Sequence, residues 1–135
     1  MATSIIKRMT IETNEIRLIN HNLPYGNFQL KPYLSRKYGK VEGQDNLYTL
    51  ELKAEFKDEP NNRFPIDLVV SVKGSFEIEG NDEEEIISFL KMQGMQMVFP
   101  YLRTMVSNIT ASALMPPIML PIIDLREFKD EEAQS

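Results

Sequence analysis

The chain has 135 residues, of which 42% are hydrophobic and 26% charged, with a formal net charge of −5 and no cysteine. This composition is typical of one globular domain with enough chain for a core, and it excludes an intrinsically disordered protein. The acidic balance argues against nucleic-acid binding, which depends on Lys and Arg at phosphates. The lack of cysteine excludes disulfides and thiolate metal sites.

A long strand is the first element that the sequence predicts, over residues 5–19. From Met9 to Thr13 the apolar side chains fall on odd positions, whereas Ile16 and Leu18 fall on even positions. Successive side chains of a strand alternate between the two faces, so the switch between these runs predicts a bulge or bend. The turn-rich and irregular segment that follows predicts at most one short strand.

Two later segments alternate more clearly. In residues 48–56 and 66–78, apolar side chains occupy nearly every second position and polar side chains most of the others. This period predicts two strands, each with one buried and one solvated face. The polar loop 57–65 joins them, so we expect them to pair antiparallel. A sheet with one apolar face needs a cover.

Two helices are predicted to supply that cover. Asn81 or Asp82, followed by three glutamates, is an N-cap with an acidic first turn, and this helix should end near Lys91, with a break at Gly94. The second helix should present to the sheet a stripe of residues spaced three and four apart: Phe99, Leu102, Val106, Ile109 and Ala113. Its opposite face carries no charge and predicts an oligomer interface formed by Met97, Tyr101, Met105, Asn108 and Ser112.

An apolar stretch, here called the ribbon, occupies residues 114–123. Its three prolines exclude a helix and favour extended geometry. Full burial of six aliphatic side chains would contribute on the order of 10 kcal/mol, comparable to the net stability of a domain. The ribbon must therefore be covered by the fold, by another subunit or by a ligand. For Met115 and Met119, the sequence leaves core packing and an adaptable binding surface equally open.

Catalytic and metal-binding patterns are missing from the sequence. The single histidine, His21, lies in a predicted turn, and the acidic run 82–85 fits helix capping better than a calcium loop. Four prolines and several polar residues, Arg103 among them, interrupt residues 92–123 and argue against a membrane span. We expect a protein that is not an enzyme, needs no cofactor or metal and does not insert into a membrane.

Several motifs in the C-terminal half resemble one known family. These are Gly-Ser-Phe-Glu-Ile-Glu-Gly at residues 74–80, Phe-Pro-Tyr-x-Arg at residues 99–103, and the proline-rich loop that follows. The strand that begins Leu-Tyr-Thr-Leu at residue 47 also fits. Over roughly residues 47–125 the chain resembles SecB, the bacterial protein-export chaperone, with Phe-Pro-Tyr-x-Arg as the most specific motif.

The resemblance implies an α+β fold: a four-stranded antiparallel sheet with helices packed on one face, in a single domain over residues 1–135 with a short acidic tail at 126–135. It implies a cytoplasmic homotetramer, built as a dimer of dimers through the long helix. Its activity would be ATP-independent holding of unfolded polypeptides in a hydrophobic groove. We expect that groove to be lined by Met115, Ile118, Met119, Leu120, Ile122, Ile123, Tyr48 and Leu50.

Two departures bear on the export role. The C-terminal zinc-binding Cys and His of the family are missing, and the acidic positions that dock on the SecA motor are only partly matched, by Glu15, with Val69 and Ile19 where acids are expected. The resemblance therefore supports the holding of polypeptides by this chain more than their delivery to SecA. The alternatives are a binding module for one partner, such as a chaperone of a toxin–antitoxin system, and a structural oligomer with a buried ribbon.

Overall fold

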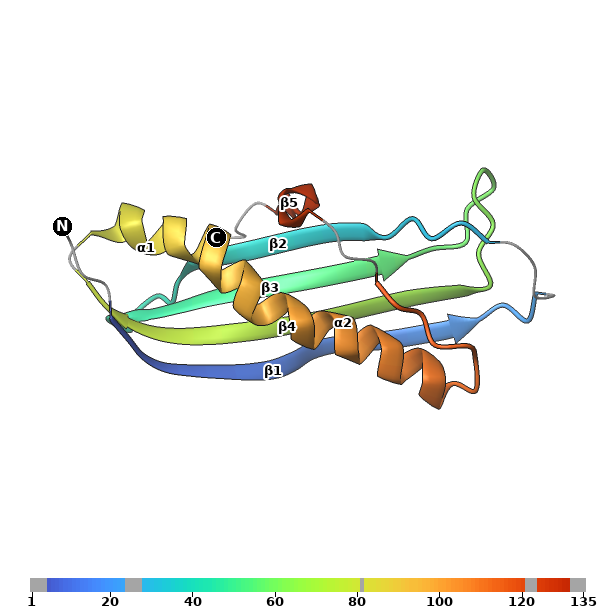
Figure 1. The fold of residues 1–135 in the computed structure, drawn as a ribbon, viewed down its shortest axis with the longest axis horizontal. Coiled ribbons are helices and arrows are strands. Elements are labelled where there is room, and N and C mark those ends of the chain that lie inside the picture. The colour runs from blue at the N-terminus through green and yellow to red at the C-terminus, as the bar shows by residue number, and fades with distance from the viewer. Residues whose placement is uncertain (1–4, 24–27, 81, 121–123, 132–135) are drawn as a thin grey trace.

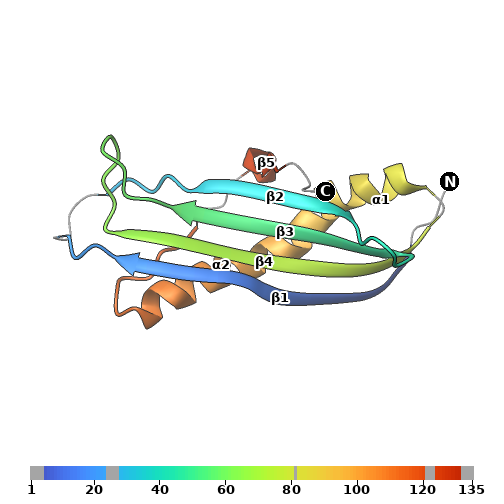
Figure 2. The same ribbon diagram turned by 180° about the vertical axis from the view of Figure 1, so that it is seen from behind.

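A computed structural model describes residues 5–23, 28–80, 82–120 and 124–131. Within these residues, one twisted sheet carries a long helix diagonally across one face (Figure 1). In the described part of the chain, the other face of the sheet carries no helix (Figure 2). The strands, in their order across the sheet, are β1 (Ile5–Asn20), β4 (Ile66–Glu79), β3 (Leu47–Phe56), β2 (Tyr33–Lys40) and β5 (Lys129–Asp130).

The prediction of an antiparallel β3–β4 pair is confirmed. The two strands pair from Leu47 opposite Glu77 to Phe56 opposite Leu68. Burial alternates strictly along β3, and the residues with buried side chains are Tyr48, Leu50, Leu52, Ala54 and Phe56. This apolar face and the matching face of β4 form the floor of the core, because the helix lies directly on them.

The predicted irregularity in β1 is also confirmed. One shift in its register with β4 falls between Thr13 and Glu15, where the apolar positions change from odd to even. The extra residue returns Ile16 and Leu18 to the face that carries the helix, opposite Val70 and Leu68.

The sheet differs from the predicted four antiparallel strands, because within the described residues it has five strands and is mixed. The fifth strand, β5, runs parallel to β2, with Lys129 beside Ser35 and Asp130 beside Arg36. The sequence predicts only a short acidic tail over residues 126–135. Its first part instead forms a 3₁₀ turn, Leu125–Glu127, followed by β5, because Phe128 is buried in the core and anchors it.

Gly94 does not break the helix, contrary to prediction. Asp82 caps α1 (Glu83–Phe89), as predicted, by accepting a hydrogen bond from the backbone of Glu84. The helix then passes through a π-helical turn, Leu90–Gly94, into α2 (Met95–Ser112). A Cβ atom on Gly94 would lie 3.3 Å from the side chain of Leu50, so this glycine lets the helix approach β3 closely.

The buried stripe of α2 is rotated from the predicted one. Leu102 and Val106 are buried as predicted, whereas Phe99, Ile109 and Ala113 are only partly buried. The fully buried positions of α2 are Met95, Val98, Leu102, Val106 and Thr110. The reason is a close contact with β4: a Cβ atom on Gly74 would lie 2.8 Å from Cγ2 of Val98, so Val98 fits directly over the glycine.

The substitution Gly74→Ala should destabilise the fold by about 1–3 kcal/mol, because the added methyl group would force the helix away from the sheet. Gly39→Ala is the matched control, since a Cβ atom there would meet nothing within 4 Å. Chemical denaturation of both variants measures the difference. Equal stability of the two variants would contradict the proposed close packing.

A polar network ties the end of β1 to the loop between β3 and β4. His21 Nε2 lies 3.0 Å from an oxygen of Asp67, and the same carboxylate accepts a hydrogen bond from the backbone of Asp58. Asp58 in turn accepts hydrogen bonds from Arg63 and from the backbone of Phe64. The hydrogen bond from the Asp58 backbone, followed by the close approach of His21, lowers the pKa of Asp67 below its usual value of 3.8.

A carboxylate with a lowered pKa stabilises the fold above its usual pKa, and that stabilisation is lost as the pH falls through the lowered value. The variant Asp67→Asn should therefore lose stability relative to the wild type at pH 7, and the difference should shrink between about pH 4 and pH 2. Urea unfolding of both proteins at pH 7, 4 and 2.5 measures this difference in stability. A difference that stays constant over this range would refute the stabilising role of the charged Asp67 carboxylate.

Candidate functional site

The ribbon begins where α2 ends, at a residue in an uncommon conformation. Leu114 has a φ of 61°, in the left-handed region that glycine usually occupies at helix ends. The backbone of Leu114 donates to Ala111 and that of Met115 donates to Thr110, which closes the last turn of the helix. The hydroxyl of Thr110, which is buried, then accepts from the backbone of Ile118 at 2.8 Å. This bond directs the ribbon back across the sheet, on the side of the helix (Figure 1).

The predicted groove residues are divided between the core and the surface. In the described part of the ribbon, Met115 and Leu120 are buried, Ile118 is half-buried, and Met119 is 54% exposed. Ile122 and Ile123 lie outside the described residues. Tyr48 and Leu50 lie in the core beneath the helix. Their expected role in binding polypeptide stays a prediction.

Leu114 was not among the predicted site residues, although it is the most exposed of the large hydrophobic side chains in the described part of the chain, at 92%. Its side chain contributes almost nothing to the packing of its own chain. The sequence gives no direct signal for this, because exposure at this position depends on where the helix ends.

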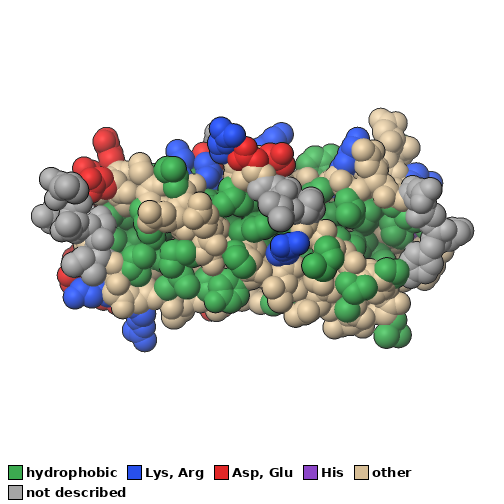
Figure 3. Space-filling model, in the orientation of Figure 1, with side chains coloured by type: hydrophobic (Ala, Val, Ile, Leu, Met, Phe, Trp, Pro, Cys, Tyr) green, Lys and Arg blue, Asp and Glu red, His purple; other side chains and the backbone are tan. Residues whose placement is uncertain are grey.

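The outward face of α2 contains the residues predicted to form an oligomer interface. Tyr101, Asn108 and Ser112 are exposed, whereas Met97 and Met105 are partly buried against the core. Figure 3 shows hydrophobic side chains along this side of the molecule, with charged side chains gathered mainly at its upper edge. The five predicted residues therefore form an uncharged face, as the prediction of an interface requires, and that interface stays a prediction.

One charged side chain interrupts this apolar region. Arg103 is partly buried, and its Nε atom has no hydrogen-bond partner within the described residues. It shares one side of α2 with Phe99, which packs edge-on against Phe128, and with Ser107, whose hydroxyl lies 3.3 Å from the sulfur of Met119. The C-terminal part of the chain therefore lies along this side of the helix.

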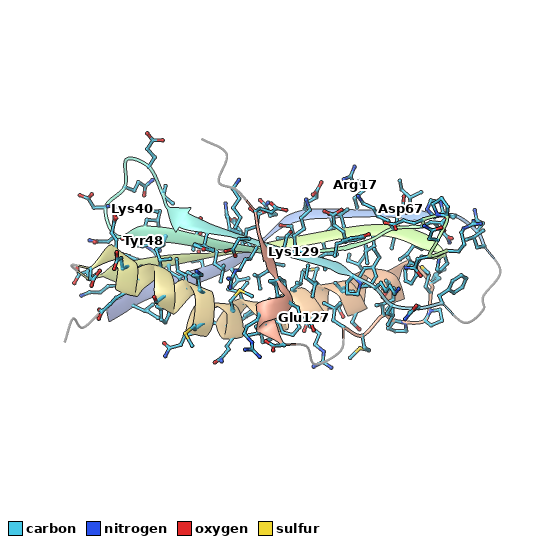
Figure 4. The ribbon with its side chains drawn as sticks, turned by 90° about the horizontal axis from the view of Figure 1, so that it is seen from above. Arg17, Lys40, Tyr48, Asp67, Glu127 and Lys129 are labelled. Carbon is cyan, nitrogen blue, oxygen red and sulfur yellow. The ribbon has the colours of Figure 1, made fainter. Side chains whose placement is uncertain are left out.

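The segment that carries β5 crosses from the helix layer to the sheet at the edge of β2. Figure 4 shows Glu127 beside the helix and Lys129 at the level of the sheet, midway between Tyr48 at one end and Asp67 at the other. Next to this crossing lies a cleft of about 510 Å³, whose lining includes Tyr33, Lys57, Glu59 and Glu127. The lining of this cleft mixes such polar and charged groups with the apolar side chains of Pro32 and Leu34.

Two further kinds of feature, metal-binding clusters and membrane-spanning helices, are missing from the described residues. Among them, no group of three His, Asp or Glu side chains lies close enough together to hold a metal ion. No helix in the same part of the chain is long and apolar enough to cross a membrane.

Comparisons with known proteins agree with the fold. The family described as "Preprotein translocase subunit SecB" matches residues 6–135. An uncharacterized protein of Methanocaldococcus jannaschii, MJ0357, is 30% identical over 106 residues, which cover 73% of this chain and 67% of that protein. The protein-export protein SecB of Agrobacterium fabrum is 30% identical over 88 residues, which cover 65% of this chain and 54% of that protein. The chain thus matches about half the length of this export protein.

A solved structure shows the same fold at low sequence identity. It is that of the Mycobacterium tuberculosis SecB-like chaperone Rv1957 in complex with a ChAD peptide from the Rv1956 HigA1 antitoxin. The similarity has a TM-score of 0.73 at 14% identity and covers 90% of this chain and 91% of the other. With a family match that spans nearly the whole chain and a shared fold, the chain belongs to the SecB family.

Proposed function

We propose that this protein is an ATP-independent holdase chaperone that binds extended apolar segments of unfolded polypeptides at the ribbon. Membership of the SecB family and the chaperone-type fold support a chaperone function. The observation that carries the proposal is the exposure of Leu114 and Met119 on a proline-stiffened ribbon whose other side chains, Met115 and Leu120, hold it to the core. The uncharged, half-apolar outward face of α2 supports a homo-oligomer, for which a tetramer is the expected form.

Leu114 strengthens the argument because its conformation costs stability. The left-handed region disfavours a residue with a Cβ atom by roughly 1–2 kcal/mol. A leucine there whose side chain is also exposed gains nothing from its own core to offset that cost. Local strain of this kind is commonly retained at functional positions.

The first test compares two exposed apolar residues on opposite faces of the sheet. Met119→Gln should raise the concentration of protein needed to halve the aggregation of a chemically denatured model client roughly fivefold, by removing about 1 kcal/mol of apolar contact. Ile19→Gln is the control, since Ile19 is equally exposed, at 52%, but lies opposite Asp67 on the helix-free face. The proposal fails if the wild type does not slow aggregation or if both variants behave alike.

The second test separates binding from folding at Leu114. Leu114→Gly should raise the free energy of unfolding by about 0.5–1 kcal/mol, because glycine adopts the left-handed conformation freely. It should also weaken client binding severalfold. Leu114→Ala should weaken binding as much and leave stability within about 0.5 kcal/mol, since it keeps the strain. If Leu114→Gly binds the client as tightly as the wild type does, Leu114 is not part of the binding site.

A second candidate function is a binding module for one dedicated partner. The peptide bound to the Mycobacterium tuberculosis neighbour comes from an antitoxin, which favours this reading for a chain of the same fold. The same aggregation assay with several unrelated clients separates the two: similar protection of all clients supports the general holdase. Protection of none, together with stoichiometric binding to a single polypeptide, supports the dedicated module. Delivery to the SecA motor would be a further step beyond holding.

A further inference from the structure

The two-residue strand β5 is held to the edge of β2 by more than the backbone pairing of the two strands. The backbone of Glu131 donates a hydrogen bond of 2.8 Å to the carbonyl of Arg36, and β5 pairs with Ser35 and Arg36 only. The remaining residues of β2 have no strand partner on that side within the described part of the chain. A strand of two residues cannot hold itself in place by backbone pairing alone, so side chains must supply the rest.

Side chains supply two anchors spaced two residues apart. The first is Phe128, which is 3% exposed and packs edge-on against Phe99 with ring centroids 6.0 Å apart. The second is Asp130, whose carboxylate accepts hydrogen bonds from Arg36 Nε and from the hydroxyl of Tyr38. The Arg36 guanidinium lowers the pKa of Asp130, so the carboxylate is charged at neutral pH.

Arg36 is itself fixed in place by the helix layer. A second nitrogen of its guanidinium donates to the backbone carbonyl of Lys91, in the π-helical turn, at 3.2 Å. Lys91 and Arg36 both lie close to the ring of Tyr38, with the Nζ atom of Lys91 5.8 Å from the ring centroid. The carboxylate site is therefore built by β2 and the helix together, from residues that lie outside the segment that occupies it.

The spacing of the anchors follows from extended geometry. In a strand, residues two apart point to the same side, so an aromatic residue and a carboxylate in the pattern aromatic-x-acid reach both anchors at once. An exposed sheet edge with two side-chain sites is the arrangement by which extended peptides bind as an added strand. The cleft beside Tyr33 and Glu59 gives room for the chain that precedes the aromatic residue.

We infer that the edge of β2 is a strand-docking site for extended polypeptides with the pattern aromatic-x-acid, and that the chain's own segment Phe128–Glu131 occupies it as a tethered competitor. This inference rests on the proposed function for its class of ligand, an unfolded polypeptide. A tethered segment acts at an effective concentration on the order of millimolar, so an incoming polypeptide must displace it.

The experiment measures the binding of a fluorescent peptide with the sequence of residues 125–131 to the full-length chain. Asp130→Asn weakens the tethered segment and should bind the peptide about tenfold more tightly than the wild type does. Replacing the aspartate of the peptide by asparagine, or its phenylalanine by alanine, should abolish that gain. Asp124→Asn is the matched control, because among the described residues Asp124 bonds only to Arg126, within its own segment.

A second change shows that the gain arises at the carboxylate site and not from misfolding. Added to Asp130→Asn, Tyr38→Phe keeps the ring and removes only the hydroxyl that the aspartate of the peptide would contact, so it should reverse part of the gain in affinity. Equal affinity of wild type and Asp130→Asn, or no binding to either, overturns the inference. Client protection by the wild type in the aggregation assay is measured separately, so a failure of the proposed function is distinguished from a failure of this site.

Discussion

The close contact of the long helix with the sheet determines most of this structure. Val98 fits over Gly74 on β4, and Gly94 leaves room for Leu50 on β3. These two contacts fix both the distance and the rotation of the helix, so that Leu102 and Val106 are buried while Tyr101 faces outward. The outward position of Tyr101 thus follows from packing at two glycines. The helix ends next to Leu114, whose left-handed backbone, together with the hydroxyl of Thr110, turns the ribbon back across the sheet.

Local periodic signals predicted the parts of the fold that depend on local sequence. The alternation in β3 and β4, the bulge in β1 and the cap at Asp82 are all readable within a few residues. The errors arose where contacts between residues far apart in the sequence determine the structure. Phe128 lies in a charged tail and anchors β5 only because Phe99 is near it in space, and Gly94 reads as a helix break unless Leu50 is known to lie beside it.

The same limit applies to the candidate site. The sequence predicted an apolar ribbon that its own fold covers only in part, and the structure divides it into Met115 and Leu120, which are buried, and Met119, which is exposed. It could not predict Leu114, since neither its left-handed backbone nor its exposure is encoded by a recognisable pattern. The edge of β2 was also missed, because its anchors Arg36 and Tyr38 lie in a segment with little alternation. An exposed ribbon and an edge held by a short tethered strand both suit a protein that binds extended chains.

The central claim is that this chain holds an unfolded polypeptide without nucleotide. Native mass measurement of the purified protein, with and without a chemically denatured client and with no ATP present, tests it most directly. The account predicts a discrete oligomer whose mass rises by that of bound client. An unchanged mass at client concentrations well above those that aggregate alone would contradict it.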